Sequence, residues 1–138
     1  KKHITSDIFF LNYSDALSDV NIKDLVKFHK SKKSDLTILS VNPPTMFGLV
    51  ESDQTGRVTK FQEKTPIQNV YINGGFFVCS KSLLEIFTEI DDHVMFEDQY
   101  IFSKLINKNI YTHKHNGFWQ CVDTIKDLNI LSKKVKDV

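Results

Sequence analysis

Two aspartates, Asp15 and Asp123, stand far apart in the sequence at places where ligand-binding residues are common. Asp15 follows the apolar run at residues 8–11, and Asp123 lies between the chain's single tryptophan and a helix-like segment. In open α/β sheets, ligands gather at the carboxyl ends of strands, which is where Asp15 would lie. An aspartate at either place can equally be a turn or helix-capping residue. From its position alone, each aspartate can therefore be interpreted as a ligand-binding residue or as a turn or capping residue.

Two further segments carry polar groups beside predicted strands. Glu63 and Lys64 end one strand, where such a pair is usually a solvated surface pair. Asn73 is followed by Gly74 and Gly75, a pattern typical of turns. Paired glycines inside a strand also mark a bulge or a close approach of the backbone. Neither segment indicates a function by itself.

Histidines and cysteines give weaker candidates. His113 and His115 alternate with Tyr111 on one predicted strand face, but no third ligand follows at a spacing that suits a transition metal. Cys79 and Cys121 lack the spacing of a metal-binding pair, and we interpret them as reduced thiols of a cytoplasmic protein. Since no histidine is placed to activate Cys121, a nucleophilic role for it is not favoured.

Length and composition set wider bounds. The 138 residues suffice for one domain, residues 1–138, and the 41% hydrophobic and 25% charged content is ordinary for a globular protein. The formal net charge of +1 argues against a nucleic-acid surface, and no apolar run reaches membrane-spanning length. We therefore expect neither nucleic acid nor a membrane as a partner. The chain begins at Lys1 rather than Met, which we interpret as the loss of preceding residues.

The pattern of apolar residues predicts the elements that must position these groups. Residues 8–11 and 36–41 are predicted strands on either side of a helix that begins after Asp19 or Asn21, which makes a parallel strand–helix–strand unit. Further strands are predicted at residues 48–51, 57–62, 71–79 and 110–115, and further helices at residues 82–87, 95–106 and 124–135. This order predicts an α/β fold with a mixed, mainly parallel sheet flanked by helices.

Five segments, taken in order, resemble the sugar-phosphate nucleotidylyltransferase family, and most of all its glucose-1-phosphate cytidylyltransferases. They are Tyr-Ser-Asp-Ala-Leu-Ser-Asp-Val at 13–20, Pro-Pro and Phe-Gly within 43–48, Phe-Gln-Glu-Lys at 61–64, Ile-Asn-Gly-Gly-Phe-Phe-Val at 72–78 and His-Asn-Gly-Phe-Trp-Gln-Cys-Val-Asp-Thr at 115–124. The resemblance runs over nearly the whole chain, and its last two segments are the specific ones. It implies the nucleotide-diphospho-sugar transferase type of α/β fold.

The resemblance implies a metal site. Asp15 and Asp123 match the family's two metal-binding aspartates, and the resemblance places them at the same edge of the sheet. Mg²⁺ is the implied cofactor, because it prefers carboxylate and phosphate oxygens as ligands. With Lys64, these two aspartates are the implied catalytic residues.

The resemblance also implies a substrate site. Glu63 matches the glutamate that accepts hydrogen bonds from sugar hydroxyls, and Lys64 matches the lysine that meets the sugar phosphate. Asn73 and Gly74 match the Asn-Gly pair that lines the sugar. Gly48 matches a glycine whose missing side chain lets the backbone approach the hexose.

The implied activity transfers a nucleotidyl group from a nucleoside triphosphate, CTP by resemblance, to a hexose 1-phosphate, by resemblance glucose 1-phosphate. Guanylyl-, thymidylyl- or uridylyltransferase activity stays open. A non-catalytic relative that binds sugar phosphate or scaffolds an assembly also stays open, because Ser14 and Ala16 replace the family's glycines beside Asp15. Met46 stands where these cytidylyltransferases commonly have arginine.

The family's glycine-rich triphosphate loop, with its later Pro-Lys, is absent from this sequence. We therefore expect a domain that lacks the N-terminal nucleotide-binding half and binds nucleotide weakly or not at all alone. Without that half, the strand at residues 8–11 would expose an apolar face or a sheet edge. This predicts a homo-oligomer or a part of a longer chain.

Overall fold

The computed structural model of this chain describes residues 3–43, 45, 47–63, 65–67, 69–88 and 103–136. Its strands are β1 (Ile8–Asn12), β2 (Ala16–Ser18), β3 (Leu36–Val41), β4 (Leu49–Ser52), β5 (Val58–Gln62), β6 (Ile72–Ser80), β7 (Ile110–His115) and β8 (Trp119–Cys121). Its helices are α1 (Ile22–Ser31), α2 (Leu83–Thr88) and α4 (Ile125–Lys136). No helix in these ranges is long and apolar enough to cross a membrane.

Most predicted elements are confirmed to within a residue or two, but two groups need comment. The short strands β2 and β8 were not predicted, because three residues are too few to show a periodicity. The predicted helix at residues 95–106 lies mostly outside the described residues. Within its described part, residues 103–105 are helical.

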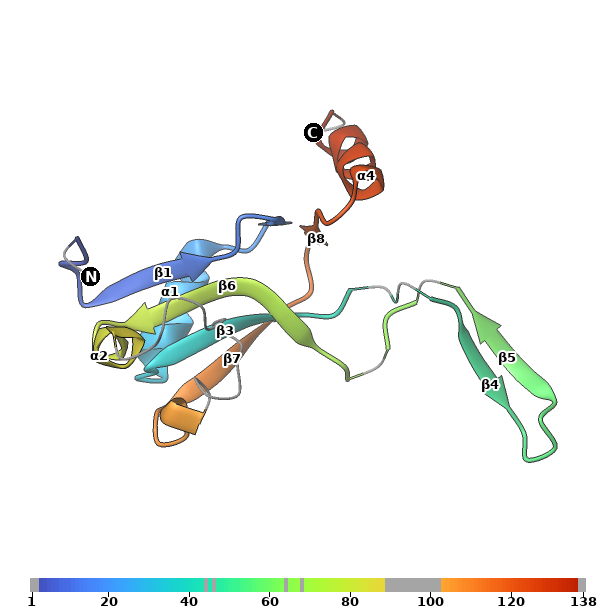
Figure 1. Ribbon diagram of the computed structural model, residues 1–138, viewed down its shortest axis with the longest axis horizontal. Helices are drawn as coiled ribbons and strands as arrows, with labels where there is room; N and C mark the ends of the chain where they lie inside the picture. The colour runs from blue at the N-terminus through green and yellow to red at the C-terminus, as the bar shows by residue number, and fades with distance from the viewer. Residues whose placement is uncertain are drawn as a thin grey trace.

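The main sheet has four described strands in the order β1-β6-β3-β7. β6 is antiparallel to both β1 and β3, and β3 is parallel to β7, so three of the four strands run in the same direction. A mixed sheet is therefore confirmed, but the expectation of a mainly parallel one is not, since only the β3–β7 pairing is parallel among the three described pairings of this sheet. The predicted parallel unit needs a correction, however: β1 and β3 are co-directional and joined through α1, but β6 lies between them (Figure 1).

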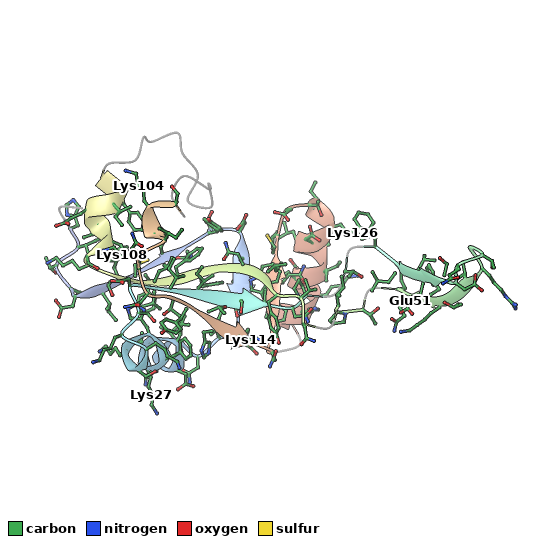
Figure 2. The ribbon with its side chains drawn as sticks, turned by 90° about the horizontal axis from the view of Figure 1, so that it is seen from below. Lys27, Glu51, Lys104, Lys108, Lys114 and Lys126 are labelled. Carbon is green, nitrogen blue, oxygen red and sulfur yellow. The ribbon has the colours of Figure 1, made fainter. Side chains whose placement is uncertain are left out.

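Helices cover both faces of this sheet. On one face, Leu25 of α1 packs in a fully buried cluster with Leu39, Val41 and Val78. On the other, Leu83 of α2 and Leu105 join a second cluster with sheet residues that include Phe77. Burial of one such leucine contributes about 2 kcal/mol. Figure 2 shows Lys27 on the side of α1 turned away from the sheet, as expected for an amphipathic helix.

A buried polar chain also joins α1 to the sheet. The Ser80 hydroxyl donates to the carbonyl oxygen of Ser34 (2.8 Å), so the Ser80 oxygen accepts from Nε2 of His29 (3.3 Å). Nδ1 of His29 then accepts from the hydroxyl of the fully buried Thr37 (2.9 Å). Both ring nitrogens of His29 are thereby paired, which is the condition for burying a histidine in a core.

β6 carries the bulge that its paired glycines predict. Its register with β3 shifts from Ile38 opposite Phe77 to Ser40 opposite Asn73. Gly75 has a φ of 75°, and its N–H donates to Oδ1 of Asn73 (2.9 Å). The extra residues bend β6, and the curvature is visible in Figure 1.

β4 and β5 form the predicted hairpin, and Figures 1 and 2 both show it projecting from the rest of the molecule. Oδ1 of Asp53 accepts from the N–H groups of Thr55 (2.9 Å) and Arg57 (3.1 Å). These hydrogen bonds close the hairpin turn, which contains Gly56 at a φ of 85°. Phe61, on β5, is 64% exposed.

β1 lies at one edge of the described sheet. Its burial is incomplete, and Phe10 is 49% exposed. An edge strand of this kind offers unpaired backbone groups beside an apolar side chain. The oligomer or longer chain inferred from it stays a prediction.

Candidate functional site

The short pair of β2 and β8 brings Asp15 and Asp123 together. Ala16 lies opposite Cys121 in this antiparallel pair, and the N–H of Val122 donates to the carbonyl oxygen of Asp15 (2.8 Å). The two aspartates flank the paired segment, Asp15 just before β2 and Asp123 two residues after β8 ends. The predicted convergence of the two carboxylates at one place is therefore present in the structure.

Three donor atoms meet at this place. One carboxylate oxygen each from Asp15 and Asp123 and Sγ of Cys121 all lie within 4.8 Å of one another. Both aspartates are exposed and the cysteine is half-buried, with Sγ 3.4 Å from Oδ1 of Asp123. Burial raises the pKa of the Cys121 thiol to about 11, and the hydrogen bond to Asp123 and the charges of both aspartates add to the shift. The thiol is thus protonated at neutral pH, and the two carboxylates supply the oxygen donors.

These donors fit the implied Mg²⁺. Two exposed carboxylates within reach of one ion supply the hard oxygen ligands that Mg²⁺ selects, and their exposure leaves room for the waters that it keeps. Asp15 and Asp123 would hold the ion. Sequence reasoning considered Cys121 as a reduced thiol and as a nucleophile, and it missed the place of this residue beside Asp15 as well as Asp123. Its separation of two residues from Asp123 on extended backbone was the available signal.

Helix α4 is capped without Asp123. Oγ1 of Thr124 accepts from the N–H of Asp127 (3.2 Å), while the N–H of Thr124 donates to Oδ2 of Asp127 (2.9 Å). This reciprocal pair is a capping box. The hydrogen bond from the Thr124 hydroxyl is the first cause that lowers the pKa of Asp127. The sequence left open whether Asp123 or Thr124 caps the helix, and the structure assigns the cap to Thr124.

Trp119 connects the predicted sugar segment to the aspartates. Its indole Nε1 donates to the carbonyl oxygen of Gly74 (2.8 Å), so β8 is tied to the bulge of β6 beside Asn73. A Cβ at Gly74 would lie 3.0 Å from the carbonyl oxygen of Leu39. Close strand packing therefore accounts for the glycine, and its contact with a sugar stays a prediction.

Gly48 and Glu63 lie together at the base of the hairpin. A Cβ at Gly48 would come within 2.8 Å of both Oε2 of Glu63 and the ring of Phe61. The missing side chain thus leaves space for the carboxylate. Lys64, predicted to meet the sugar phosphate, lies outside the described residues. The structure therefore brings Gly48 to Glu63, and Asn73–Gly74 to Trp119, as two separate groups.

A cavity of about 330 Å³ opens where the parallel strands β3 and β7 end. Its lining includes Asn42, Pro66, His115, Asn116 and Trp119. Pro66 follows Glu63 by three residues, but the described part of the predicted sugar site, Gly48, Glu63, Asn73 and Gly74, does not line this cavity. Sequence reasoning missed Asn42 and Asn116, although the carboxyl ends of parallel strands are where ligands are expected.

Within the described ranges, His113 and His115 do not belong to a candidate metal site. The ring of His113 packs edge-on against Phe28, with 5.0 Å between centroids. Nε2 of His115 lies 2.8 Å from Oδ1 of Asp19, and a Cβ at Gly117 would collide with both groups. Among the described residues, the candidate metal cluster is that of Asp15, Cys121 and Asp123.

A mixed α/β sheet with a carboxylate pair and a cavity at strand ends defines a class of ligand-binding domains. Within it, the sequence matches the family described as nucleotidyl transferase over residues 2–138. The chain therefore belongs to the nucleotidyl transferase family.

Several relatives are similar to this chain. It is 31% identical over 133 residues to a probable glucose-1-phosphate cytidylyltransferase of Bacillus subtilis (strain 168), covering 96% of this chain and 51% of that protein. It is 32% identical over 121 residues to the glucose-1-phosphate cytidylyltransferase of Salmonella typhi, covering 88% and 46%. The chain thus spans about half the length of these curated relatives. Adenylyl-, guanylyl- and uridylyltransferases of sugar phosphates also match, at 24% to 29% identity.

Solved structures confirm the fold. The crystal structure of HddC from Yersinia pseudotuberculosis is similar with a TM-score of 0.67 at 19% identity, covering 97% of this chain and 58% of that chain. At this identity the likeness concerns the fold alone.

Proposed function

We propose that this chain carries the metal-binding and sugar-phosphate-binding part of an enzyme that transfers a nucleotidyl group to a hexose 1-phosphate. The observation that carries the proposal is the convergence of Asp15 and Asp123, in a chain that belongs to the nucleotidyl transferase family. The capping box of Thr124 supports it, because Asp123 is not needed to cap α4.

In the proposed reaction, a phosphate oxygen of the hexose 1-phosphate attacks the α-phosphorus of a nucleoside triphosphate. The bond from that phosphorus to the bridging oxygen breaks, and pyrophosphate leaves with the electron pair. Such a transfer depends on alignment and on neutralising charge. Mg²⁺ held by Asp15 and Asp123 would supply the charge neutralisation. The hydrogen bond from Val122 to the Asp15 carbonyl keeps the two strands that carry these carboxylates in register.

We place the hexose 1-phosphate at the cavity where β3 and β7 end. A volume of about 330 Å³ suits a ligand of this size. Glu63 would accept hydrogen bonds from sugar hydroxyls, Asn73 and Gly74 would line the sugar, and Lys64 would meet the phosphate. Pro66 in the cavity wall supports this placement, because it follows Glu63 and Lys64 closely.

We propose CTP and glucose 1-phosphate as the substrates. The two cytidylyltransferases at 31% and 32% identity support this choice over the adenylyl-, guanylyl- and uridylyltransferases, which match at lower identity. Selection of the base would depend on the part of the relatives that this chain does not span.

Pyrophosphate release by the full-length gene product that contains this chain tests the proposal. With Mg²⁺, CTP and glucose 1-phosphate, we expect release that falls about 100-fold or more in Asp15→Asn and Asp123→Asn. Asp24→Asn, in the first turn of α1, removes an equally exposed carboxylate away from the site and should retain full activity.

Two outcomes would count against the proposal. Failure to release pyrophosphate from any nucleoside triphosphate with any hexose 1-phosphate would exclude the transfer. Full activity in both aspartate variants would exclude the metal site. Binding of glucose 1-phosphate without any transfer would favour the non-catalytic relative.

A further inference from the structure

We propose that Cys121 is a third metal donor beside Asp15 and Asp123, and that it lets this site capture thiophilic divalent ions such as Zn²⁺ and Cd²⁺. The inference deepens the proposed function, since it concerns the same site and rests on the two aspartates as metal ligands. It concerns which ions the site selects.

The geometry of the three donors carries the inference. One oxygen from each aspartate and Sγ of Cys121 lie within 4.8 Å of one another. Sulfur and oxygen ligands lie about 2.3 Å and about 2.1 Å from Zn²⁺, so in a tetrahedral site they are roughly 3.6 Å apart. The three side chains therefore need only small movements to bind a common ion.

The backbone fixes this arrangement from two sides. Cys121 lies opposite Ala16 in the β2–β8 pair, next to Asp15, and the Val122–Asp15 hydrogen bond continues the pairing. Asp123 follows Cys121 by two residues, and its Oδ1 already lies 3.4 Å from Sγ. The half-buried cysteine thus lies beside two exposed aspartates.

The chemistry of the donors then decides which ions bind more tightly when Cys121 is present. Carboxylate oxygens suit Mg²⁺ and Mn²⁺, whereas a thiolate favours Zn²⁺ and other thiophilic ions. For Mg²⁺, the thiol is a neighbour and not a ligand. For Zn²⁺ or Cd²⁺, a sulfur–metal bond forms and the thiol proton passes to the solvent. The site therefore gains affinity for thiophilic ions that two carboxylates alone would lack.

Titration of the 138-residue chain with Cd²⁺ tests the inference, because a cadmium–thiolate bond gives an ultraviolet charge-transfer band. We expect one equivalent to bind with this band, and Zn²⁺ to displace it. Cys121→Ala should abolish the band and weaken Cd²⁺ binding by more than about tenfold. Cys79→Ala, which removes the fully buried thiol, is the matched control and should retain both.

Mn²⁺ binding, followed by electron paramagnetic resonance, separates this inference from the proposed function. We expect Asp15→Asn and Asp123→Asn to weaken Mn²⁺ binding, and Cys121→Ala to leave it within about twofold. Aspartate-dependent Mn²⁺ binding without a cadmium–thiolate band would overturn the role of Cys121 and leave the proposed function standing. A cadmium–thiolate band with unchanged Cd²⁺ affinity in both aspartate variants would also overturn the role of Cys121 as a third donor, because the thiol would then bind the ion without the aspartates. Loss of Mn²⁺ binding in the single variant Cys121→Ala would contradict the inference that Cys121 matters for thiophilic ions and not for Mn²⁺.

Discussion

The indole nitrogen of Trp119 donates a 2.8 Å hydrogen bond to the carbonyl oxygen of Gly74. This contact joins two segments of different predicted roles, the β6 bulge beside Asn73 and the strand that leads to Asp123. It does so from one end of the three-residue β2–β8 pair, where Trp119 lies opposite Ser18.

Trp119→Phe removes this hydrogen bond and keeps an aromatic ring. We expect the free energy of unfolding to fall by about 1 kcal/mol, the net worth of a typical hydrogen bond. We also expect weaker Mn²⁺ binding, because β8 is no longer held to β6. Chemical denaturation and a metal titration measure the two effects. A variant with unchanged stability and unchanged metal affinity would show that the contact does not position the site.

Gly75→Ala tests the bulge. Gly75 has a φ of 75°, and an added Cβ would lie 3.1 Å from the Tyr13 ring. Gly56→Ala is the matched control, since Gly56 has a φ of 85° but open space around it. We expect about 1 kcal/mol of destabilisation for Gly56→Ala from the left-handed backbone alone, and clearly more for Gly75→Ala. Equal losses of stability in thermal denaturation would exclude a packing role for the close approach to Tyr13.

His29 should make stability depend on pH. Burial lowers the pKa of His29 below its ordinary 6.5, against the nearby Asp35 charge that raises it, and Lys30 lowers it further. Below about pH 6.5 the unfolded chain therefore takes up a proton that the folded chain does not, so stability falls as the pH falls. Above pH 6.5 both states are neutral at this residue, and its contribution is constant.

His29→Gln provides the comparison. We expect it to be less stable at pH 7.5 by about 1–3 kcal/mol, because Thr37 or Ser80 loses a partner. Its stability should depend less on pH between 6.5 and 5 than that of the wild type. Urea denaturation at several pH values measures both, and parallel pH profiles would rule out His29 as the source.

The two thiols should differ in reactivity. Burial raises the pKa of Cys79 to about 12, and its side chain is fully buried, whereas Cys121 is half-buried with a pKa raised to about 11. A disulfide reagent at pH 8 should therefore modify Cys121 slowly and Cys79 only after unfolding. The folded Cys121→Ser variant should not react with the reagent, because its remaining thiol, Cys79, is buried. Rapid modification of both thiols in the native chain would contradict the burial of Cys79.

Local signals predicted the elements well, because apolar runs and turn residues are local properties. The hairpin turn at Asp53 and Gly56 and the bulge at Gly75 are examples. Strand order is not local, which explains why the sequence could not show β6 between β1 and β3.

The candidate site divides in the same way. The resemblance placed Asp15 beside Asp123, and the structure confirms that these two meet. Whether Asp123 caps α4 depended on side-chain geometry, which the sequence does not contain. Cys121 was missed because its neighbour Asp15 is near only after β2 and β8 pair. The sugar contacts of Glu63, Asn73 and Gly74 stay predictions, as does that of Lys64.

The strand order also has a consequence for how the chain folds. Of the pairings among the described strands, only that of β4 with β5 joins neighbours in sequence. Such a hairpin closes in microseconds, whereas pairings between distant segments raise the contact order and slow folding. During synthesis, β3 must wait for β6 to emerge before its first edge is paired, and for β7 before its second edge is paired. The nascent chain therefore exposes β3, which is buried almost throughout in the folded domain, until β7 emerges, and protection of that strand would fall to cellular chaperones.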